Sequence, residues 1–216
     1  MIDRSRGSPA LLKFFIEEFA GTLVTDFWGA YNKVVCARRQ MCLVHLLRDF
    51  VTVEKYKHPG KHWPAFAKKT RRLIRDAIRL GKRGDLAAEE FASRRDRFDT
   101  RLQDLIDTPW QDSQAKRLIK RFRRHQGHLF TFLDQPDVPF DNNHGERSIR
   151  PAVIIRKNSY CNRSRRGADT QALLMSVYRT LKQRGHDPIQ TVANAVACYL
   201  TNGQLPPLPT KTTAYG

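Results

Sequence analysis

The sequence predicts an α/β chain that starts with a short α/β region, continues through a long all-α block and ends in further helices. Three observations support this prediction. The β-branched run Thr22–Asp26 is typical of a short strand. Residues 62–133 are rich in Arg, Lys, Ala and Leu and poor in β-branched pairs, and residues 168–184 repeat apolar side chains at helical spacing. At 216 residues, the chain is long enough for one domain with a sizeable core, or for one domain with a helical insertion.

The first fifty residues alternate between helix and strand signals. After a strand end at the very start, Ser8-Pro9 has the pattern of an N-cap followed by proline, and apolar spacing predicts a helix over residues 9–19. The strand that follows places Asp26 at its C-terminal tip. Gln40–Leu43 is expected to form a second short strand, and Val44 to enter another helix.

The all-α block is strongly basic, because residues 61–130 contain 19 Lys and Arg against 9 Asp and Glu. Breaks at Gly81–Gly84 and Thr108-Pro109 divide it. Its helices are expected at about 62–80, 85–106 and 111–133. A plain helical hairpin with solvated charges is the alternative explanation of its basic faces.

The C-terminal part is expected to be helical with short interruptions. It should comprise a helix at 143–149, extended pieces at 153–155 and 158–161, a basic loop at 163–167, a helix at 168–184, and a helix from Asp187-Pro188 to about Tyr199. From Asn202 onward, a proline-rich segment predicts an extended or disordered tail.

The composition indicates a polyanionic partner. The net charge of +18 and the sequence pI of about 10.3 favour nucleic acid, with a ribosome-associated protein as the alternative. No apolar run is long enough to span a membrane, so no membrane partner is expected. The four cysteines form no CxxC pair and follow no secretory signal, which indicates reduced thiols in the cytoplasm. Cys42 and His45 have C-x-x-H spacing, but no second pair completes a zinc site.

The stretch Asp141–Pro151 is the most informative segment of the chain. It sets one acid, Glu146, among asparagines and arginines, and Arg156-Lys157-Asn158 follows it. A metal-dependent enzyme that acts on nucleic acid needs this mixture, because a carboxylate holds a hard cation and arginines hold the polyanion beside it. The alternative is an ordinary helix start in which Asp141 is the cap and the arginines are solvated.

Asp26 and Glu146 together form the candidate catalytic and metal-binding pair. A carboxylate at a strand end beside a carboxylate on a helix can bridge Mg²⁺ or Mn²⁺. Two such ions about 3.5–4 Å apart activate a water or a 3′-hydroxyl in phosphodiester chemistry. Taken alone, Asp26 is better explained as a cap of the following helix.

Four blocks of the sequence resemble, in their order and separation, the catalytic region of the insertion-sequence-66 family of bacterial transposases. They are Thr22–Asn32, Gln40–Arg48 with His45 and Arg48, Asp141–Pro151, and Arg156–Asn158. The resemblance extends into the helices of residues 168–200 and so covers nearly the whole chain. It implies an RNase H-like fold with a helical insertion before the acidic helix. It also implies an Asp-Asp-Glu site that binds Mg²⁺ or Mn²⁺ and cuts and joins DNA.

Carried over by position, Asp26 resembles the second acid of that site and Glu146 the third. Arginines and lysine at the other family-like positions suit phosphate, and asparagines can bond DNA or orient Glu146. The expected DNA-binding residues are Asn142, Asn143, Arg147, Arg150, Arg156, Lys157, Asn158, Arg165 and Arg166.

The family's first catalytic Asp and its N-terminal DNA-binding region correspond to sequence upstream of these blocks. The resemblance therefore implies an N-terminally truncated transposase with impaired metal binding and an unpaired sheet edge. Its expected parts are a partial RNase H-like core (1–50), a basic helical insertion (51–137), the Glu146 segment with C-terminal helices (138–201) and a Pro-rich tail (202–216).

Two functions are therefore expected. The first is metal-dependent DNA strand cleavage and strand transfer at the ends of an insertion element, impaired in this chain alone. The alternative is a non-catalytic remnant that binds DNA by charge or inhibits intact transposase. The expected partners are the element's terminal repeats, target DNA, further transposase copies and accessory proteins of the same element. The expected location is the bacterial cytoplasm, at the nucleoid when the protein binds DNA.

Overall fold

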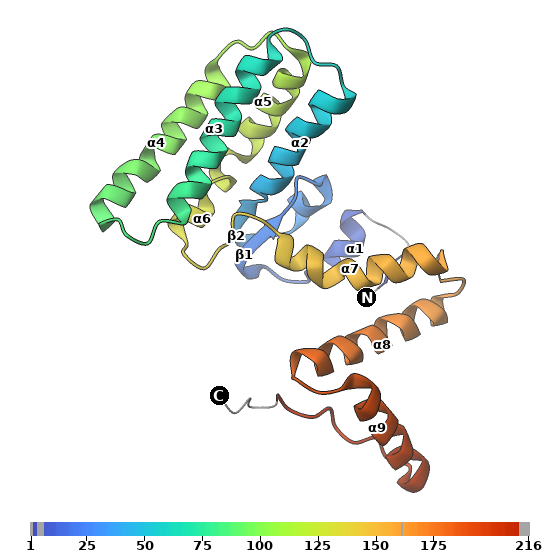
Figure 1. The fold of residues 1–216 in the computed structure, drawn as a ribbon. Coiled ribbons are helices and arrows are strands. Elements are labelled where there is room, and N and C mark those ends of the chain that lie inside the picture. Colours follow the sequence, from blue (N-terminus) through green and yellow to red (C-terminus); the bar gives the residue numbers. More distant parts are fainter. Residues whose placement is uncertain (1, 4–6, 161, 212–216) are drawn as a thin grey trace. The chain divides into compact units, whose positions relative to one another are not determined.

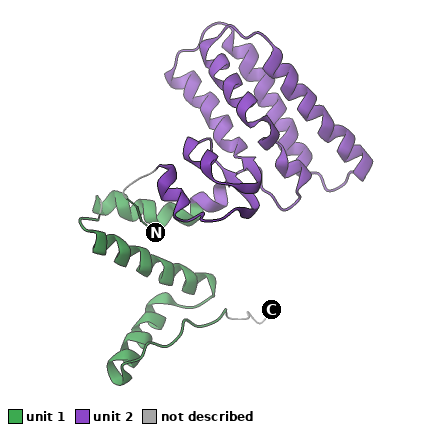
Figure 2. Ribbon diagram, turned by 180° about the vertical axis from the view of Figure 1, so that it is seen from behind, with its two compact units in different colours: residues 1–4, 147–216 green, residues 5–146 purple. Residues whose placement is uncertain are grey.

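The chain is mostly helical and contains one small parallel sheet (Figure 1), which confirms the predicted α/β class with a large helical part. The structure is a computed structural model that describes residues 2–3, 7–160 and 162–211. It divides into two compact units (Figure 2), residues 5–146 and residues 1–4 with 147–216. Within the described ranges, no helix is long and apolar enough to cross a membrane.

Two parallel strands make up the sheet. β1 (Phe19–Thr25) pairs with β2 (Cys36–Met41), and the register sets Thr25 opposite Met41. Because the strands are parallel, their carboxyl ends meet at the same edge of the sheet. Asp26 follows β1 directly, so the predicted position of this acid at a strand tip is confirmed.

The helix predicted over residues 9–19 is wrong beyond its first turns. α1 (Ser8–Leu12) is only five residues long, and no side chain caps its start. Phe19 belongs to β1 instead, because its N–H donates to the carbonyl of Val35 at 3.0 Å. Pairing between strands has therefore overridden a local helical pattern. The strand end expected at the very start is not formed by residues 2–3; the neighbouring residues 1 and 4–6 lie outside the described part.

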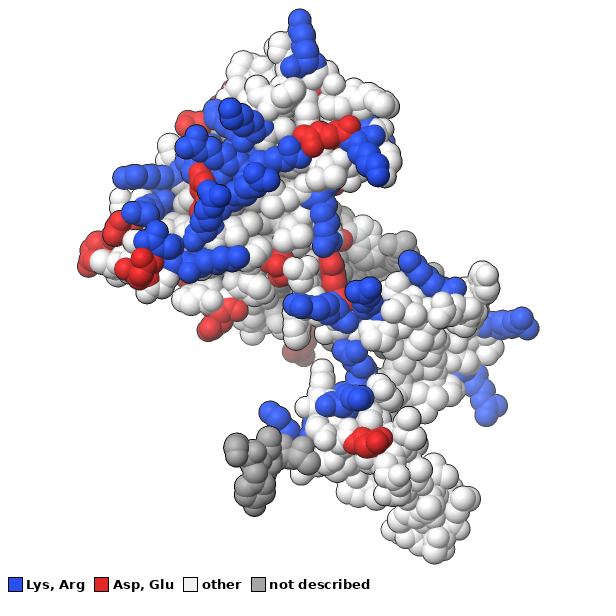
Figure 3. Space-filling model, in the orientation of Figure 1, with Lys and Arg blue, Asp and Glu red and all other residues white. Residues whose placement is uncertain are grey.

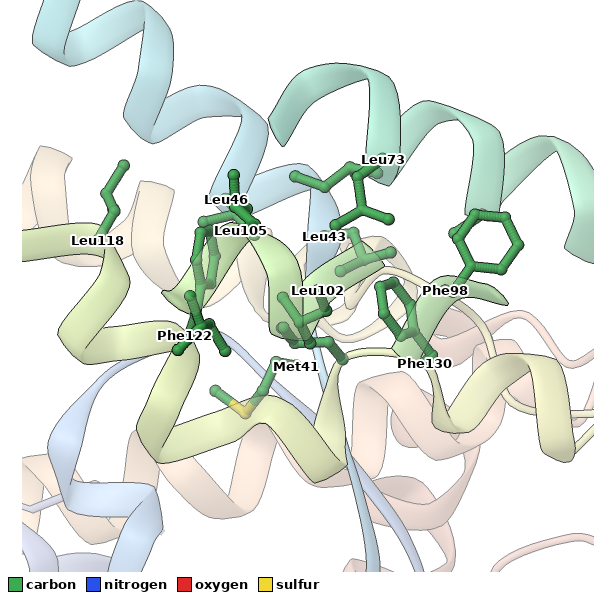
Figure 4. Close-up of a cluster of buried hydrophobic side chains, with 14 of the residues drawn as sticks. Met41, Leu43, Leu46, Leu73, Phe98, Leu102, Leu105, Leu118, Phe122 and Phe130 are labelled. Atoms are coloured by element: carbon green, nitrogen blue, oxygen red, sulfur yellow. The ribbon is translucent and has the colours of Figure 1, made fainter. Parts of the chain in front are cut away.

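Four helices form a bundle that continues from the end of β2. They are α2 (Leu43–Tyr56), α3 (Trp63–Gly81), α4 (Ala88–Asp107) and α5 (Ser113–His125). In α3, the buried positions recur every three or four residues, as expected for a helix with one apolar face. Figure 4 shows Met41 of β2 in the same core as Leu73, Leu102 and Phe122 from three of these helices. The first two predicted helices of the block are confirmed.

The third predicted helix, 111–133, is interrupted at His125. The 3-10 helix η2 (Gln126–His128) and the short helix α6 (Thr131–Asp134) follow it. The side chain of Gln40 on β2 is fully buried and bonds the backbone that follows this break. Its Nε2 donates to the carbonyl of Leu129 at 3.0 Å, and its Oε1 accepts the N–H of Phe132 at 2.9 Å. These are backbone groups that a continuous helix would satisfy internally.

The C-terminal unit consists of helices. α7 (Asn143–Ser159) continues through Pro151, and the boundary between the two units falls within it. The extended pieces predicted at 153–155 and 158–161 are therefore wrong over their described residues; Cys161 lies outside them. The β-branched residues that suggested a strand lower helix propensity by only a few tenths of a kcal/mol each, too little to end a helix already begun.

Side-chain caps fix the starts of the next two helices. Ser164 Oγ accepts the N–H of Gly167 at 3.0 Å, so α8 (Arg165–Gln183) begins inside the basic loop predicted at 163–167. Asp187 Oδ1 accepts the N–H of Ile189 at 2.8 Å and starts α9 (Pro188–Asn202) where the sequence predicts it. Residues 204–211 form neither helix nor strand, as expected of the Pro-rich tail; residues 212–216 lie outside the description.

Replacing Gln40 with leucine should destabilise the unit of residues 5–146 by about 2–4 kcal/mol. The substitution keeps the side-chain volume but leaves the Leu129 carbonyl and the Phe132 N–H buried without a partner. Urea unfolding followed by circular dichroism measures the change. Gln103→Leu is the matched control, because Gln103 is exposed on α4 and should shift stability by less than about 0.5 kcal/mol. Equal unfolding midpoints for both variants would refute the role of Gln40.

His125 should make stability depend on pH. It is buried against the Phe27 ring, and burial, aided by the positive charges of His128 and Arg124, lowers its pKa to about 4. The unfolded imidazole has a pKa of about 6.5, so the unfolded chain binds the proton first as the pH falls. His125 should therefore cost stability progressively from about pH 6.5 down to pH 4, by on the order of 2 kcal/mol.

The measurement is the urea midpoint of the unmodified chain and of His125→Gln at several pH values in that window. The variant should lose less stability on acidification than the unmodified chain. His144→Gln removes an exposed histidine and should leave the pH dependence unchanged. A His125→Gln profile parallel to that of the unmodified chain would show that His125 does not carry this dependence.

Candidate active site

Two consecutive backbone amides at the end of β2 hold the segments that carry the two candidate acids. The N–H of Cys42 donates to the carbonyl of Thr25 at 2.7 Å, one residue before Asp26. The N–H of Leu43 donates to the carbonyl of Phe140 at 2.9 Å, on the segment that leads to Glu146. Cys42 is the N-cap of α2 and Leu43 its first residue. One short stretch of chain therefore anchors both acidic segments within the unit of residues 5–146.

Glu146 lies in the first turn of α7, where its N–H donates to the carbonyl of Asn142 at 3.0 Å. Its carboxylate faces two side chains from α2. His45 Nε2 lies 3.2 Å from Oε1, and Arg48 Nη1 lies 3.7 Å from Oε2. The Glu146 side chain is 35% exposed, so it is held in place and still open to solvent. The helix start expected at Asp141 is also confirmed, because Asp141 Oδ1 accepts the N–H of Asn143 at 2.9 Å.

His45 connects Glu146 to Cys42. Its Nδ1 lies 3.2 Å from Cys42 Sγ, while its Nε2 faces Glu146. Burial raises the pKa of the Cys42 thiol, so this group keeps its proton at neutral pH. If this thiol donates to Nδ1, a neutral ring carries its proton on Nε2, where it faces the carboxylate. The C-x-x-H spacing thus serves to orient a carboxylate at the start of a helix.

Asp26 has a different environment at the tip of β1. Its Oδ1 accepts the N–H of Trp28 at 2.9 Å, which closes a turn toward the 3-10 helix η1 (Gly29–Lys33). The alternative in which Asp26 caps the following segment therefore describes part of its role. The pKa of Tyr31 is raised, first by burial and then by the negative charge of Asp26. Tyr31 is a neighbour of the acid that the motif analysis did not identify.

Three oxygen donors of the two acidic segments are of the chemical type that a hard cation prefers. Asp26 and Glu146 offer carboxylate oxygens, and the buried amide oxygen Oδ1 of Asn142 has no hydrogen-bond partner within the described residues. Mg²⁺ and Mn²⁺ prefer oxygen ligands of this kind. Across residues 2–3, 7–160 and 162–211, however, no group of three or more His, Cys, Asp and Glu side chains is arranged to hold a metal ion. The chemistry of the oxygens fits, and the set of carboxylates is smaller than a two-metal site needs.

The asparagines of the motif have separate roles. Asn143 Nδ2 donates to Asp141 Oδ2 at 2.7 Å, so this amide supports the helix start. The Asn142 carbonyl accepts the N–H of Glu146, and the Asn142 N–H bonds the Cys42 sulfur. This second bond lowers the pKa of the Cys42 thiol, but burial raises it by more. Both residues were expected to contact DNA or to orient Glu146. Their observed contacts are with Asp141 at the helix start and with the Cys42 sulfur.

The remaining expected DNA-binding residues lie in the C-terminal unit, and all are exposed. They are Arg147, Arg150, Arg156, Lys157, Asn158, Arg165 and Arg166. By helical spacing, Arg147, Arg150 and Lys157 share one face of α7, whereas Arg156 lies on the opposite face. Arg156 lines a cavity of about 600 Å³ together with Arg165 of α8. The DNA-binding residues predicted for this unit therefore do not all lie on one surface.

A comparison with models of known protein families identifies the family of this chain. The model of the Transposase IS66 family matches residues 1–170 of the chain. This span is well over half of the sequence and includes both acids, the helical bundle and α7. The chain belongs to the IS66 family of transposases.

Two curated relatives come from Sinorhizobium fredii. The uncharacterized protein y4jD is 26% identical over 199 residues, which cover 84% of this chain and 38% of y4jD. The uncharacterized protein y4qI is 24% identical over 201 residues, which cover 82% of this chain and 36% of y4qI. The chain thus spans little more than a third of the length of these relatives. No solved structure matches it with significant similarity.

The protonation of the His45 ring can be tested directly. Long-range ¹H–¹⁵N correlation spectra recorded near pH 8 should show His45 as the Nε2–H tautomer, because Cys42 donates to Nδ1 and Glu146 accepts from Nε2. Cys42→Ser keeps a donor and should preserve this tautomer. Cys42→Ala and Glu146→Gln should each produce a mixture. A ring that is mostly Nδ1–H in the unmodified chain would contradict the assignment.

Proposed function

We propose that the chain is the catalytic region of a transposase that cleaves DNA strands at the ends of an insertion element and transfers them to target DNA. The observation that carries this proposal is the joint anchoring of the Asp26 and Glu146 segments by the amides of Cys42 and Leu43. Family membership over residues 1–170 supports it. In this proposal the two-stranded parallel sheet is part of an RNase H-like core, and the bundle is an insertion before the acidic helix.

Each residue of the site has a defined part in this proposal. Asp26 and Glu146 would hold Mg²⁺ or Mn²⁺, which when bound supplies Lewis-acid stabilisation of phosphate oxygens. His45 and Arg48 hold the Glu146 carboxylate in one orientation by a ring N–H and a guanidinium. The exposed arginines of α7 and α8 bind backbone phosphates and position the DNA.

The complete reaction is proposed for a protein of the full length of the relatives. The first catalytic Asp implied by the family resemblance is assigned to no residue of this sequence, and the relatives are more than twice as long as the matched region. The same proposal includes the element's terminal repeats and target DNA as substrates, and further transposase copies and accessory proteins of the element as partners. The reaction would take place in the bacterial cytoplasm, at the nucleoid.

A non-catalytic DNA-binding protein is the second candidate function. It is favoured by the net charge of +18 together with only two assigned catalytic carboxylates. Such a protein would bind DNA by charge or inhibit an intact transposase. Its affinity would fall steeply with salt and depend little on sequence.

Nicking of supercoiled plasmid DNA in Mn²⁺ separates the two functions when it is assayed in a protein extended to the length of the relatives, with the first catalytic Asp that the resemblance implies. If the chain is catalytic, Asp26→Ala and Glu146→Ala should each reduce nicking at least about 100-fold, since each removes a metal-holding carboxylate. Asp137→Ala and Glu89→Ala remove exposed acids outside the site and are the matched controls. DNA binding should persist in all four variants.

Two results would count against the catalytic assignment. Nicking by Glu146→Ala at the rate of the unmodified chain would remove Glu146 from the site. DNA binding without any Mn²⁺-dependent nicking by the extended protein would favour the non-catalytic function.

A further inference from the structure

One face of α3 carries a row of basic side chains. Lys68, Arg72, Arg75 and Arg79 follow one another at spacings of four, three and four residues, so they form a single stripe along the helix. All four are exposed, because the opposite face of α3 is packed into the core. At a rise of about 1.5 Å per residue, the stripe is about 16 Å long.

The neighbouring helix α4 extends this stripe into a surface. Arg101 of α4 bonds Asp76 of α3 at 2.9 Å. A groove of about 550 Å³ lies between the two helices, and its lining includes Lys68, Lys69 and Arg72. Figure 3 shows Lys and Arg side chains gathered over α3 and α4. The basic face of α3 and α4 is defined here by Lys68, Lys69, Arg72, Arg75, Arg79, Arg97 and Arg101.

The positive charge of this face is mostly not neutralised. Asp76 is shared among three arginines of the face, at distances of 2.9 to 3.9 Å, and one carboxylate cannot balance three guanidinium groups. Lys68, Lys69, Arg75 and Arg97 have no acidic partner among the described residues. Arg71 and Arg95, by contrast, pair with Glu54 and Asp134.

The surface also lacks the features of a protein-docking site. Between residues 57 and 148, no large hydrophobic side chain is exposed, and every residue of this range lies in the described part of the chain. Protein interfaces are built around buried aromatic or apolar anchors and are poor in lysine. A face made of long cationic side chains without such anchors matches a polyanion with regularly spaced charges.

We propose that the basic face of α3 and α4 binds the phosphate backbone of duplex DNA without reading its sequence. A stripe of about 16 Å corresponds to about five base pairs at 3.4 Å per phosphate of one strand. Lysine and arginine on the outside of a packed hairpin reach phosphates, and phosphate contacts carry no sequence information. The face contains neither Asp26 nor Glu146. It gives the protein a DNA contact that depends on charge alone and does not rest on the catalytic proposal.

A comparison of two quadruple variants of the full chain tests this proposal. The first, Lys68→Gln, Lys69→Gln, Arg75→Gln and Arg97→Gln, removes the four unpaired charges of the basic face. The second, Lys116→Gln, Arg117→Gln, Lys120→Gln and Arg124→Gln, removes four exposed charges from α5. Both variants have the same net charge, and circular dichroism checks that both are folded.

The readout is the affinity for a fluorescent 25-base-pair duplex of arbitrary sequence, measured by anisotropy over a range of KCl concentrations. The first variant should bind at least about tenfold more weakly near 150 mM KCl, and its slope of log affinity against log salt should fall by about 3 to 4, since four phosphate contacts are lost. The α5 variant should lose less than about threefold, with a slope changed by less than about one.

Two outcomes would overturn the proposal: equal losses in the two variants, or no loss in the first variant. The result is independent of catalysis, because Asp26→Ala and Glu146→Ala should leave the contrast between the two variants intact. If nicking is absent and this contrast persists, only the catalytic proposal fails. If nicking is present and the contrast is absent, only the basic-face proposal fails.

Discussion

Two adjacent N–H groups, those of Cys42 and Leu43, are the constraint on which the candidate site depends. One bonds the end of β1 and the other the segment before α7, so residues distant in sequence are tied to a single point at the start of α2. Backbone amides are obligatory donors when buried, and this gives the junction its fixed geometry. Side-chain contacts add to these backbone bonds: the Cys42 sulfur contacts the His45 ring, and the His45 ring contacts the Glu146 carboxylate.

The C-terminal end of the helical bundle is also bonded to the sheet, at Arg39 and Gln40 of β2. Gln40, next to the junction, bonds backbone groups of Leu129 and Phe132, and Thr131 Oγ1 donates to the carbonyl of Arg39 at 2.7 Å. Both ends of the long helical segment are therefore held at β2, one by continuity into α2 and one by these bonds. The bundle can then carry its exposed basic residues on a rigid support while its apolar faces fill one shared core.

Much of this architecture could be predicted from the sequence where local signals were strong. The β-branched run before Asp26, the apolar spacing of α3 and α4 and the Asp141 cap all gave correct elements. The bonds from Gln40 to the backbone after this break could not be predicted, because Gln40 lies 89 positions before Leu129. The contact between His45 and Glu146 likewise depends on tertiary folding, although the spacing from Cys42 to His45 was visible. The extended pieces predicted at 153–155 and 158–160 are wrong, because the strand propensity of β-branched residues is too weak to end α7.

The most direct test of the central claim is a double-mutant cycle for Mn²⁺ binding, followed by electron paramagnetic resonance, with Asp26→Asn, Glu146→Gln and both together. If the two carboxylates hold a common ion, each single substitution should weaken binding strongly, and the second should add little in the presence of the first. Effects that simply add, or Mn²⁺ binding unchanged in either single variant, would show that Asp26 and Glu146 do not share a metal site.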